Sequence, residues 1–228
     1  DNKHDGEIGE NWYAWSFYID DSDLSSFTDD HLIQLGQFKQ SFTYPIIEEY
    51  SHCETENDDY AGVTFMFKLK PNHKGLGVSR EYCNEKGLYK LVSKYNPVID
   101  KKDLFNNWHD IILHVKWGED GFMKLFINGD LQYSEKGFIS EVVYSSKEKK
   151  YDAPVFRYGI YSGNRPKEYS GKLVAYYDGI ARARNCTDNK FSNLLNELGY
   201  NCNELGDKDG FVINGEPRCL NCKLDLSD

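Results

Sequence analysis

The stretch that decides the fold runs from Trp108 to Tyr133 and reads WHDIILHVKWGEDGFMKLFINGDLQY. Its two apolar runs flank a Gly-Glu-Asp-Gly turn, and the pair Asn128-Gly129 then supplies the positive-φ residues that a two-residue hairpin turn favours. The runs are short and rich in β-branched and aromatic residues, as strands are. The stretch therefore predicts three consecutive antiparallel strands.

The same pattern continues on both sides of this stretch. Further strands are predicted at residues 11–19, His31–Lys39, Gly62–Lys70, Val155–Tyr161 and Lys172–Arg184. Strands at this spacing, with almost no helical period between them, are typical of sandwiches and jelly rolls. We predict an all-β fold, a concanavalin-like β-jelly-roll sandwich.

Composition and charge limit the function classes. The 228 residues include 17 Tyr, 13 Phe and 4 Trp, and the net charge is −10. This acidity argues against nucleic acid as a partner, although a local basic groove can still bind a polyanion on an acidic body. No apolar run approaches the roughly 18 residues that a membrane span needs, so no membrane partner is predicted either.

The six cysteines predict disulfides and an oxidising compartment, and hence a secreted protein. We expect Cys53 to pair with Cys83 and the last four cysteines to pair among themselves. Zinc is the rival interpretation, because Cys219 and Cys222 have ligand spacing, but a second such pair is missing. Residues 186–228 hold those four cysteines and one amphipathic helix, Asp188–Leu198. We therefore predict a jelly roll at 1–185 and a disulfide-stapled cap at 186–228.

Two acidic segments are candidate calcium sites. Residues 48–59 carry six acids and no Lys or Arg, which usually marks a solvated loop. The segment Asp207–Glu216 resembles part of a calcium loop, but Leu205 stands where the first ligand belongs, so an Asp-Gly turn is favoured. No cofactor is predicted to be required, no metal ligand is assigned, and a structural calcium stays open.

Polar side chains on two apolar strands are the candidate site. Alternation along Val155–Tyr161 places Arg157, Gly159 and Tyr161 on one face. The two long side chains start about 13 Å apart, close enough for both to reach one sugar, and the glycine leaves a dip between them. A tyrosine corner, or an arginine stacked on rings, is the plain structural alternative. Strict alternation along the strand 31–39 predicts a shared face for Ile33, Leu35, Gln37 and Lys39.

Motifs of other enzyme classes are missing. The sequence has no Gly-x-Ser-x-Gly elbow, no phosphate-binding glycine loop and no His-x-x-x-His pair.

Six segments in this order resemble the heparin lyase I-like polysaccharide lyases. They cover roughly residues 9–184 and are Gly9–Asp20, Leu35–Lys39, Asn107–Trp117, Gly121–Gly129, Phe156–Tyr161 and Tyr176–Gly179. The resemblance implies a jelly roll whose concave sheet lines a groove for an acidic polysaccharide. It also implies cleavage by β-elimination at a uronic acid.

Site residues follow from the resemblance position by position. Tyr161 matches a family tyrosine, Arg157 stands at a lysine position, and Gln37-Phe38-Lys39 matches a Gln-aromatic-His element. Gln37 and Arg157 would neutralise the substrate carboxylate. Tyr161 would transfer the protons, with Lys39 as the alternative base if its pKa is lowered. Substrate binding is assigned to Arg80, Tyr158 and Arg165.

The predicted partner is an acidic polysaccharide: alginate, glucuronan or a glycosaminoglycan-like chain. The net charge favours a carboxylate-only chain over a densely sulfated one. A secreted monomer is expected. Two other classes stay open: a non-catalytic, lectin-like jelly roll in which the lysine at position 39 has removed catalysis, and a structural or surface-attachment protein stapled by its tail.

Overall fold

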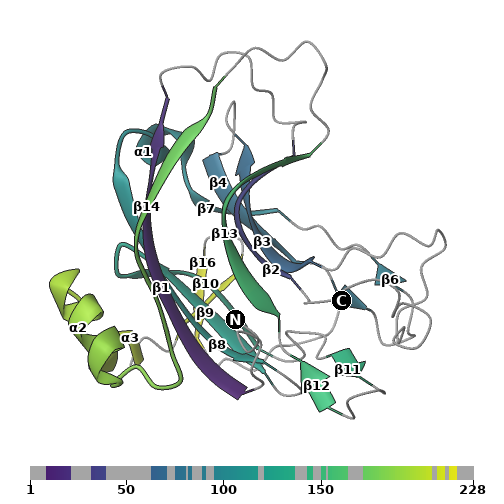
Figure 1. Cartoon of the computed structure of the whole chain (residues 1–228), viewed down its shortest axis with the longest axis vertical. Coiled ribbons are helices and arrows are strands. Elements are labelled where there is room, and N and C mark those ends of the chain that lie inside the picture. Colours follow the sequence, from purple (N-terminus) through teal and green to yellow (C-terminus); the bar gives the residue numbers. More distant parts are fainter. Residues whose placement is uncertain are drawn as a thin grey trace.

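Two five-stranded antiparallel sheets form the body of the computed structural model (Figure 1). The structure describes residues 9–21, 32–39, 63–70, 75–80, 82–83, 89–90, 95–117, 121–136, 143–145, 150–152, 154–163, 172–206, 210–213 and 216–219. None of the helices within these ranges is long and apolar enough to cross a membrane.

Sheet I has the order β10-β9-β8-β1-β14. Its strands are β10 (Asp130–Lys136), β9 (Phe122–Ile127), β8 (Trp108–Trp117), β1 (Gly9–Asp20) and β14 (Val174–Ala183). The predicted three-strand stretch is confirmed as β8, β9 and β10, and Asn128 and Gly129 have φ of 51° and 82° in the turn before β10.

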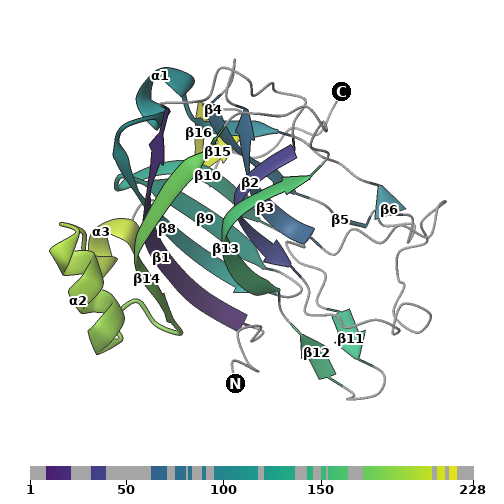
Figure 2. The same ribbon diagram turned by 45° about the horizontal axis from the view of Figure 1, so that its top comes forward.

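Sheet II has the order β13-β2-β3-β4-β7 and lies across from sheet I (Figure 2). Its strands are β13 (Val155–Gly163), β2 (Leu32–Lys39), β3 (Val63–Lys70), β4 (Gly75–Arg80) and β7 (Asn96–Ile99). The described smaller elements are α1 (Lys101–Leu104), α2 (Asn189–Glu197), α3 (Cys202–Gly206), β5 (Tyr82–Cys83) with β6 (Tyr89–Lys90), β11 (Val143–Ser145) with β12 (Lys150–Asp152), and β15 (Gly210–Ile213) with β16 (Glu216–Cys219). This architecture confirms the predicted jelly-roll sandwich.

Aromatic rings fill the space between the two sheets. Phe38 of sheet II contacts Tyr13 and Trp117 of sheet I, with ring centroids 5.0 and 5.2 Å apart. All three side chains are fully buried. The inner faces of both sheets therefore carry the main core, as in other aligned sandwiches.

A β-bulge corrects the alternation predicted for residues 31–39. Ile33, Leu35 and Phe38 all belong to the core, whereas Gln37 is only half-buried. The register against β3 shifts between Gln34 and Gly36. Strict alternation is therefore wrong here, because one extra residue in β2 moves Gln37 to the face opposite Ile33 and Leu35.

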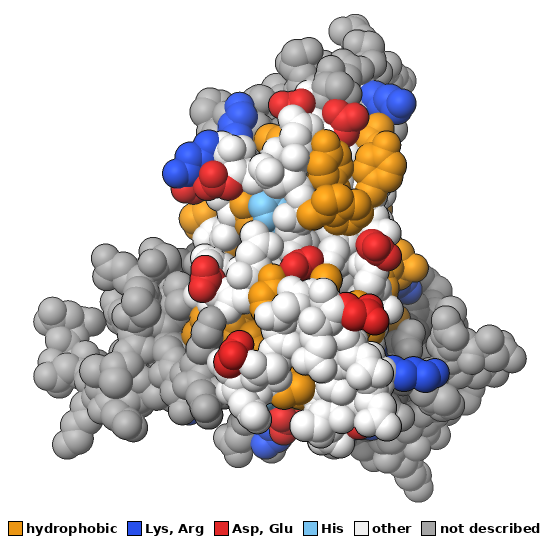
Figure 3. Space-filling view, turned by 90° about the vertical axis from the view of Figure 1, so that its left-hand side faces the viewer, with side chains coloured by type: hydrophobic (Ala, Val, Ile, Leu, Met, Phe, Trp, Pro, Cys, Tyr) orange, Lys and Arg blue, Asp and Glu red, His pale blue; other side chains and the backbone are white. Residues whose placement is uncertain are grey.

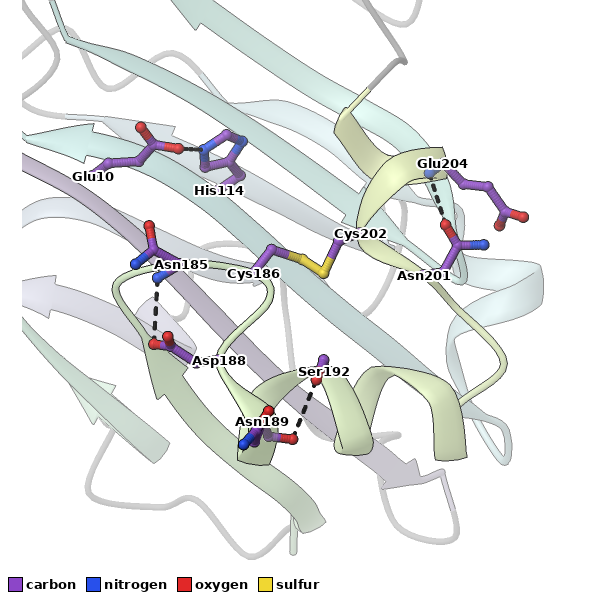
Figure 4. The surroundings of a disulfide bond; sticks show 10 residues. All are labelled: Glu10, His114, Asn185, Cys186, Asp188, Asn189, Ser192, Asn201, Cys202 and Glu204. Carbon is purple, nitrogen blue, oxygen red and sulfur yellow. Dashed lines mark hydrogen bonds and ion pairs between the residues drawn. A yellow bond between two sulfur atoms is a disulfide. The ribbon is translucent and has the colours of Figure 1, made fainter.

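The C-terminal helices cover one part of the outer face of sheet I (Figure 4). Phe191 and Leu195 of α2 and Leu205 of α3 form a second buried cluster with that face, contributed on the sheet side by Trp12, Ala14, Ile112, Phe126 and Ala183. A disulfide joins Cys186 to Cys202. The predicted disulfide and helix are thus present in this segment, while the exact boundary between jelly roll and cap stays a prediction.

The remaining cysteine predictions are not described at the side-chain level. Cys53 and Cys222 lie outside the described residues, and only the backbone of Cys83 and Cys219 is described.

Candidate active site

The β2–β13 pair at one edge of sheet II carries all four predicted catalytic residues. Arg157 lies opposite Gln37, and Tyr161 lies opposite Gln34. Gln37 is in turn opposite Met66, and the Gln34 amide donates to Met66 Sδ at 3.4 Å. Paired residues share a face of a sheet, so Arg157 and Tyr161 lie on one face with both glutamines.

That face is the outer face of sheet II, turned away from the core. Tyr161 exposes 53% of its surface and Arg157 is also exposed. Gln37 and Lys39 are half-buried, and Lys39 ends the same strand opposite Val155. Two long, exposed polar side chains thus stand beside two amides, an arrangement that can hold an anionic ligand.

Bulges set this arrangement. Between the same two rungs, β13 uses the four residues 158–161, β2 uses the three residues 34–36, and β3 uses two, Phe67 and Lys68. Gly159 has φ +115°, a backbone conformation open to glycine and rarely to other residues, and a β-carbon there would meet nothing within 4 Å. The predicted dip between Arg157 and Tyr161 is thus an open position next to the backbone.

Tyr177 supports the bulges from sheet I. Its hydroxyl donates to the Leu35 carbonyl at 2.8 Å. Burial raises the pKa of Tyr177 well above its ordinary value, and a hydrogen bond from the Gly159 backbone opposes that rise only in part. The phenol therefore stays protonated and links β14 to the irregular segments of β2 and β13.

The structure does not bring Arg80 to this face. Arg80 lies opposite the buried Phe65, and its guanidinium forms an ion pair with Glu135 of β10. Glu135 also accepts from the Tyr133 hydroxyl at 2.6 Å. Arg80, which the sequence predicted to bind substrate, therefore lies on the inner face, where it connects sheet II to sheet I.

The other two predicted substrate-binding residues are placed differently. Tyr158 lies opposite Gly36, and its ring is near those of Phe156 and Tyr177, at 6.1 and 5.8 Å between centroids. Tyr158 thus belongs to the inner side of the sheet edge, away from Arg157. Arg165 lies outside the described residues.

Sequence reasoning missed Gln34 and Ser79. Gln34 is only 4% exposed, and Ser79, opposite Met66, is 1% exposed. Within the described ranges, Gln34 Oε1 and Ser79 Oγ have no hydrogen-bond partner. The available signal was a glutamine within an apolar strand, but strict alternation separated Gln34 from Gln37 because it ignored the bulge.

No group of three or more His, Cys, Asp or Glu side chains gathers as metal ligands in the described part of the chain. Of the two calcium candidates, residues 48–59 lie outside that part, and the side chains of 207–216 are not described.

Comparison with known proteins adds a family. A family model described as "Polysaccharide lyase" matches residues 2–181. The comparison with curated proteins gives no significant match.

Two solved structures illustrate what the chain is similar to, and the first of them shares its fold. The endo-β-1,4-glucuronan lyase of the fungus Trichoderma reesei is 16% identical, with a TM-score of 0.54 over 81% of this chain and 74% of that chain. An alginate lyase from a Chlorella virus is 10% identical, with a TM-score of 0.46 over 78% of this chain and 72% of that one.

Proposed function

The chain belongs to the polysaccharide lyase family, and from this premise we propose that it cleaves a uronic-acid-containing polysaccharide by β-elimination on the outer face of sheet II. The observation that carries the proposal is the pair of rungs on that face, Arg157 opposite Gln37 and Tyr161 opposite Gln34. These residues supply the groups that the reaction needs, on two hydrogen-bonded strands.

The first requirement is to neutralise the substrate carboxylate. The proton on C5 of a uronic acid is weakly acidic because the adjacent carboxylate is negative. The Arg157 guanidinium can bind that carboxylate as a fork, and the Gln37 amide can donate to it. Both side chains share one rung, so they approach the carboxylate from neighbouring strands.

The second requirement is a pair of proton transfers. A base removes the C5 proton, the electron pair forms the C4–C5 double bond, the C4–O4 bond breaks, and an acid protonates the departing O4. We assign both transfers to Tyr161, acting as a phenolate for the first and as the resulting phenol for the second. Lys39 lies on the same edge and binds the carboxylate as a cation.

The substrate class is proposed as a carboxylate-only uronan of the glucuronan kind, bound in a groove on this face. The net charge of −10 disfavours a densely sulfated chain. The Trichoderma structure of the same fold is named a glucuronan lyase, which agrees with this choice. A secreted monomer that needs no cofactor completes the proposal.

Ultraviolet absorbance tests the proposal directly, because each cleavage creates an unsaturated uronic acid. Incubation with glucuronan, polymannuronate, polyguluronate and heparin should give rising absorbance with a non-sulfated uronan. Cleavage of heparin alone would overturn the substrate class. Binding of a uronan without any unsaturated product would favour the lectin-like alternative. The observation that supports this alternative is Lys39, which stands where the resembled family has a histidine.

A further inference from the structure

A row of three aromatic side chains crosses the outer face of sheet I, on the opposite side of the molecule from the proposed lyase site. Tyr18 of β1 lies opposite Trp108 of β8 and opposite Tyr176 of β14. Their ring centroids are 5.8 Å apart for Tyr18–Trp108 and 5.9 Å for Tyr18–Tyr176. We call these three residues the aromatic row.

The row is exposed to solvent at the end of the sheet that α2 and α3 leave uncovered. Trp108 exposes 52% of its surface and Tyr176 53%, and none of the three residues is a member of either buried cluster. Figure 3 views this side of the molecule and shows hydrophobic side chains gathered near its upper end, with acidic and basic side chains close by. Contiguous exposed rings of this kind mark binding surfaces.

The central ring of the row, Tyr18, is held in place by hydrogen bonds, which favours a built surface over chance exposure. The Tyr18 hydroxyl donates to Asn106 Oδ1 at 3.3 Å, and the same oxygen accepts from the Asp21 backbone at 3.5 Å. Asn106 has a left-handed φ of 60°, and its backbone amide donates to the Ile19 carbonyl at 2.9 Å. The turn before β8 therefore fixes the central ring from one side.

We propose that the aromatic row binds a neutral, soluble pyranose polysaccharide chain at a site separate from the lyase site. One face of a pyranose ring presents C–H groups, which pack against the electron-rich face of an aromatic ring. Three rings on adjacent strands span about 10 Å, since neighbouring strands lie about 4.8 Å apart. That width accommodates two to three sugar units.

Charge beside the row selects the neutral chain. Asp178, opposite Ser16, and Asp20, opposite Val174, lie two rungs from the Tyr18–Tyr176 rung on either side, and therefore on the same face as the row. Carboxylates accept hydrogen bonds from sugar hydroxyls. They repel the carboxylates of a uronan, so the row is ill-suited to the substrate proposed for sheet II.

The angles between the rings select a single chain over a flat crystal surface. The ring planes of Tyr18 and Trp108 meet at 47°, and those of Tyr18 and Tyr176 at 62°. A flexible soluble chain can turn from ring to ring along such a row. The planar face of crystalline cellulose cannot follow it.

Tryptophan fluorescence gives a selective measurement. Trp12, Trp15 and Trp117 are at most 4% exposed, so acrylamide quenching reports mainly Trp108. Cellohexaose should protect Trp108 from quenching in the full chain. Binding measured by calorimetry should weaken roughly tenfold in Tyr18→Ala and Trp108→Ala, which each remove one stacking ring. Ile180→Ala, which truncates another exposed apolar side chain of β14, should bind as the wild type does.

Four outcomes overturn the proposal: absent cellohexaose binding, equal binding by Trp108→Ala, tighter binding of oligoglucuronate at this row, or self-association that Trp108→Ala abolishes in sedimentation experiments. The polysaccharide class rests on the family, but the binding assay needs no turnover. Failure of the lyase proposal would appear as absent unsaturated product with cellohexaose binding retained. Failure of the aromatic-row proposal would appear as absent cellohexaose binding with uronan cleavage retained.

Discussion

The hydroxyl of Tyr161, which we assign to proton transfer, can be removed while the exposed ring is kept. Tyr161→Phe removes one exposed hydroxyl and no core contact. We expect turnover on the uronan to fall by about 10²–10⁴-fold, as for other general acid–base groups, with binding and melting temperature little changed. Initial rates of ultraviolet absorbance, together with calorimetric titration, measure both effects.

Tyr200→Phe is the matched control for this variant. Tyr200 donates to Asp110 Oδ2 at 2.9 Å on the opposite side of the molecule, so its loss should lower the melting temperature and leave turnover intact. Near-wild-type turnover by Tyr161→Phe would contradict the assignment of Tyr161 to the site.

Lys39→Ala should raise KM more than it lowers kcat. A loss of kcat as severe as that of Tyr161→Phe would instead make Lys39 the base.

His114 is a buried titrating group with a predictable pH effect. Its ring stacks on Trp12 at 3.7 Å, and its Nε2 lies 2.6 Å from Glu10 Oε1. Burial lowers the pKa of His114 below its ordinary value, although Glu10 opposes this. The unfolded chain then binds a proton at higher pH than the folded chain, so the free energy of unfolding should decrease as pH falls below about 6.5.

His114→Phe tests this effect because it keeps a stacking ring that cannot be protonated. Histidine titrates roughly between pH 5 and pH 7. Urea denaturation over this range should show that the free energy of unfolding decreases less steeply with falling pH in the variant than in the wild type. A residual slope is expected, since burial also lowers the pKa of His109. An unchanged slope would show that His114 does not contribute.

At the scale of elements, local signals were enough for the hairpins and insufficient for the bulges. The two residues Asn128 and Gly129 are enough to predict their hairpin turn. The bulge in β2 has only Gly36 as a hint, and it is set by contacts with β3 and β13 that are distant in sequence. The face shared by Arg157 and Tyr161 was predictable because it depends on alternation along one strand.

The disulfide is the element-scale feature with the clearest energetic consequence. Cys186 and Cys202 are 16 residues apart and enclose α2. Closing a loop of this length stabilises a fold by about 3 kcal/mol in the chain-entropy model. Reduction should therefore lower the melting temperature, while turnover measured well below that temperature should persist because the cap covers sheet I.

Calorimetry with and without reductant measures this difference, and Cys186→Ala/Cys202→Ala should reproduce the reduced state. Equal melting temperatures for oxidised and reduced protein would contradict the stabilising role. Free thiols at both positions in the native protein would contradict the bond itself.

At the scale of the whole molecule, an ion pair between β4 and β10 connects the two sheets. The buried Arg80 and half-buried Glu135 are 55 residues apart, and each lies on an inner face. Arg80 was assigned a substrate role from the sequence, because a sequence shows the charge of an arginine but not its partner. Burial and the partner became visible only when the sheets were placed face to face.

Glu135→Gln removes the charge of the acid and leaves Arg80 buried. We expect the free energy of unfolding to drop by about 3 kcal/mol, because removing one partner of a largely buried ion pair is costly. Arg80→Met combined with Glu135→Gln should recover part of the loss, and chemical denaturation of the three proteins measures it. A single variant as stable as the wild type would show that the pair contributes no net stability.

The four-, three- and two-residue segments of β13, β2 and β3 also bear on how this gene can change. Substitutions at exposed positions of these segments do not change the register of strand pairing. Loss of one codon between Tyr158 and Tyr161 would remove a bulge residue and so change the side-chain orientation of the residues that follow. If side chains still alternated along β13, those after the deletion would move to the other face of the sheet. Tyr161 would then face inward and its apolar neighbour would face the solvent. The strand register thus tolerates substitution at exposed positions better than it tolerates shortening, so we expect the length of these three segments to vary less than their exposed residues do.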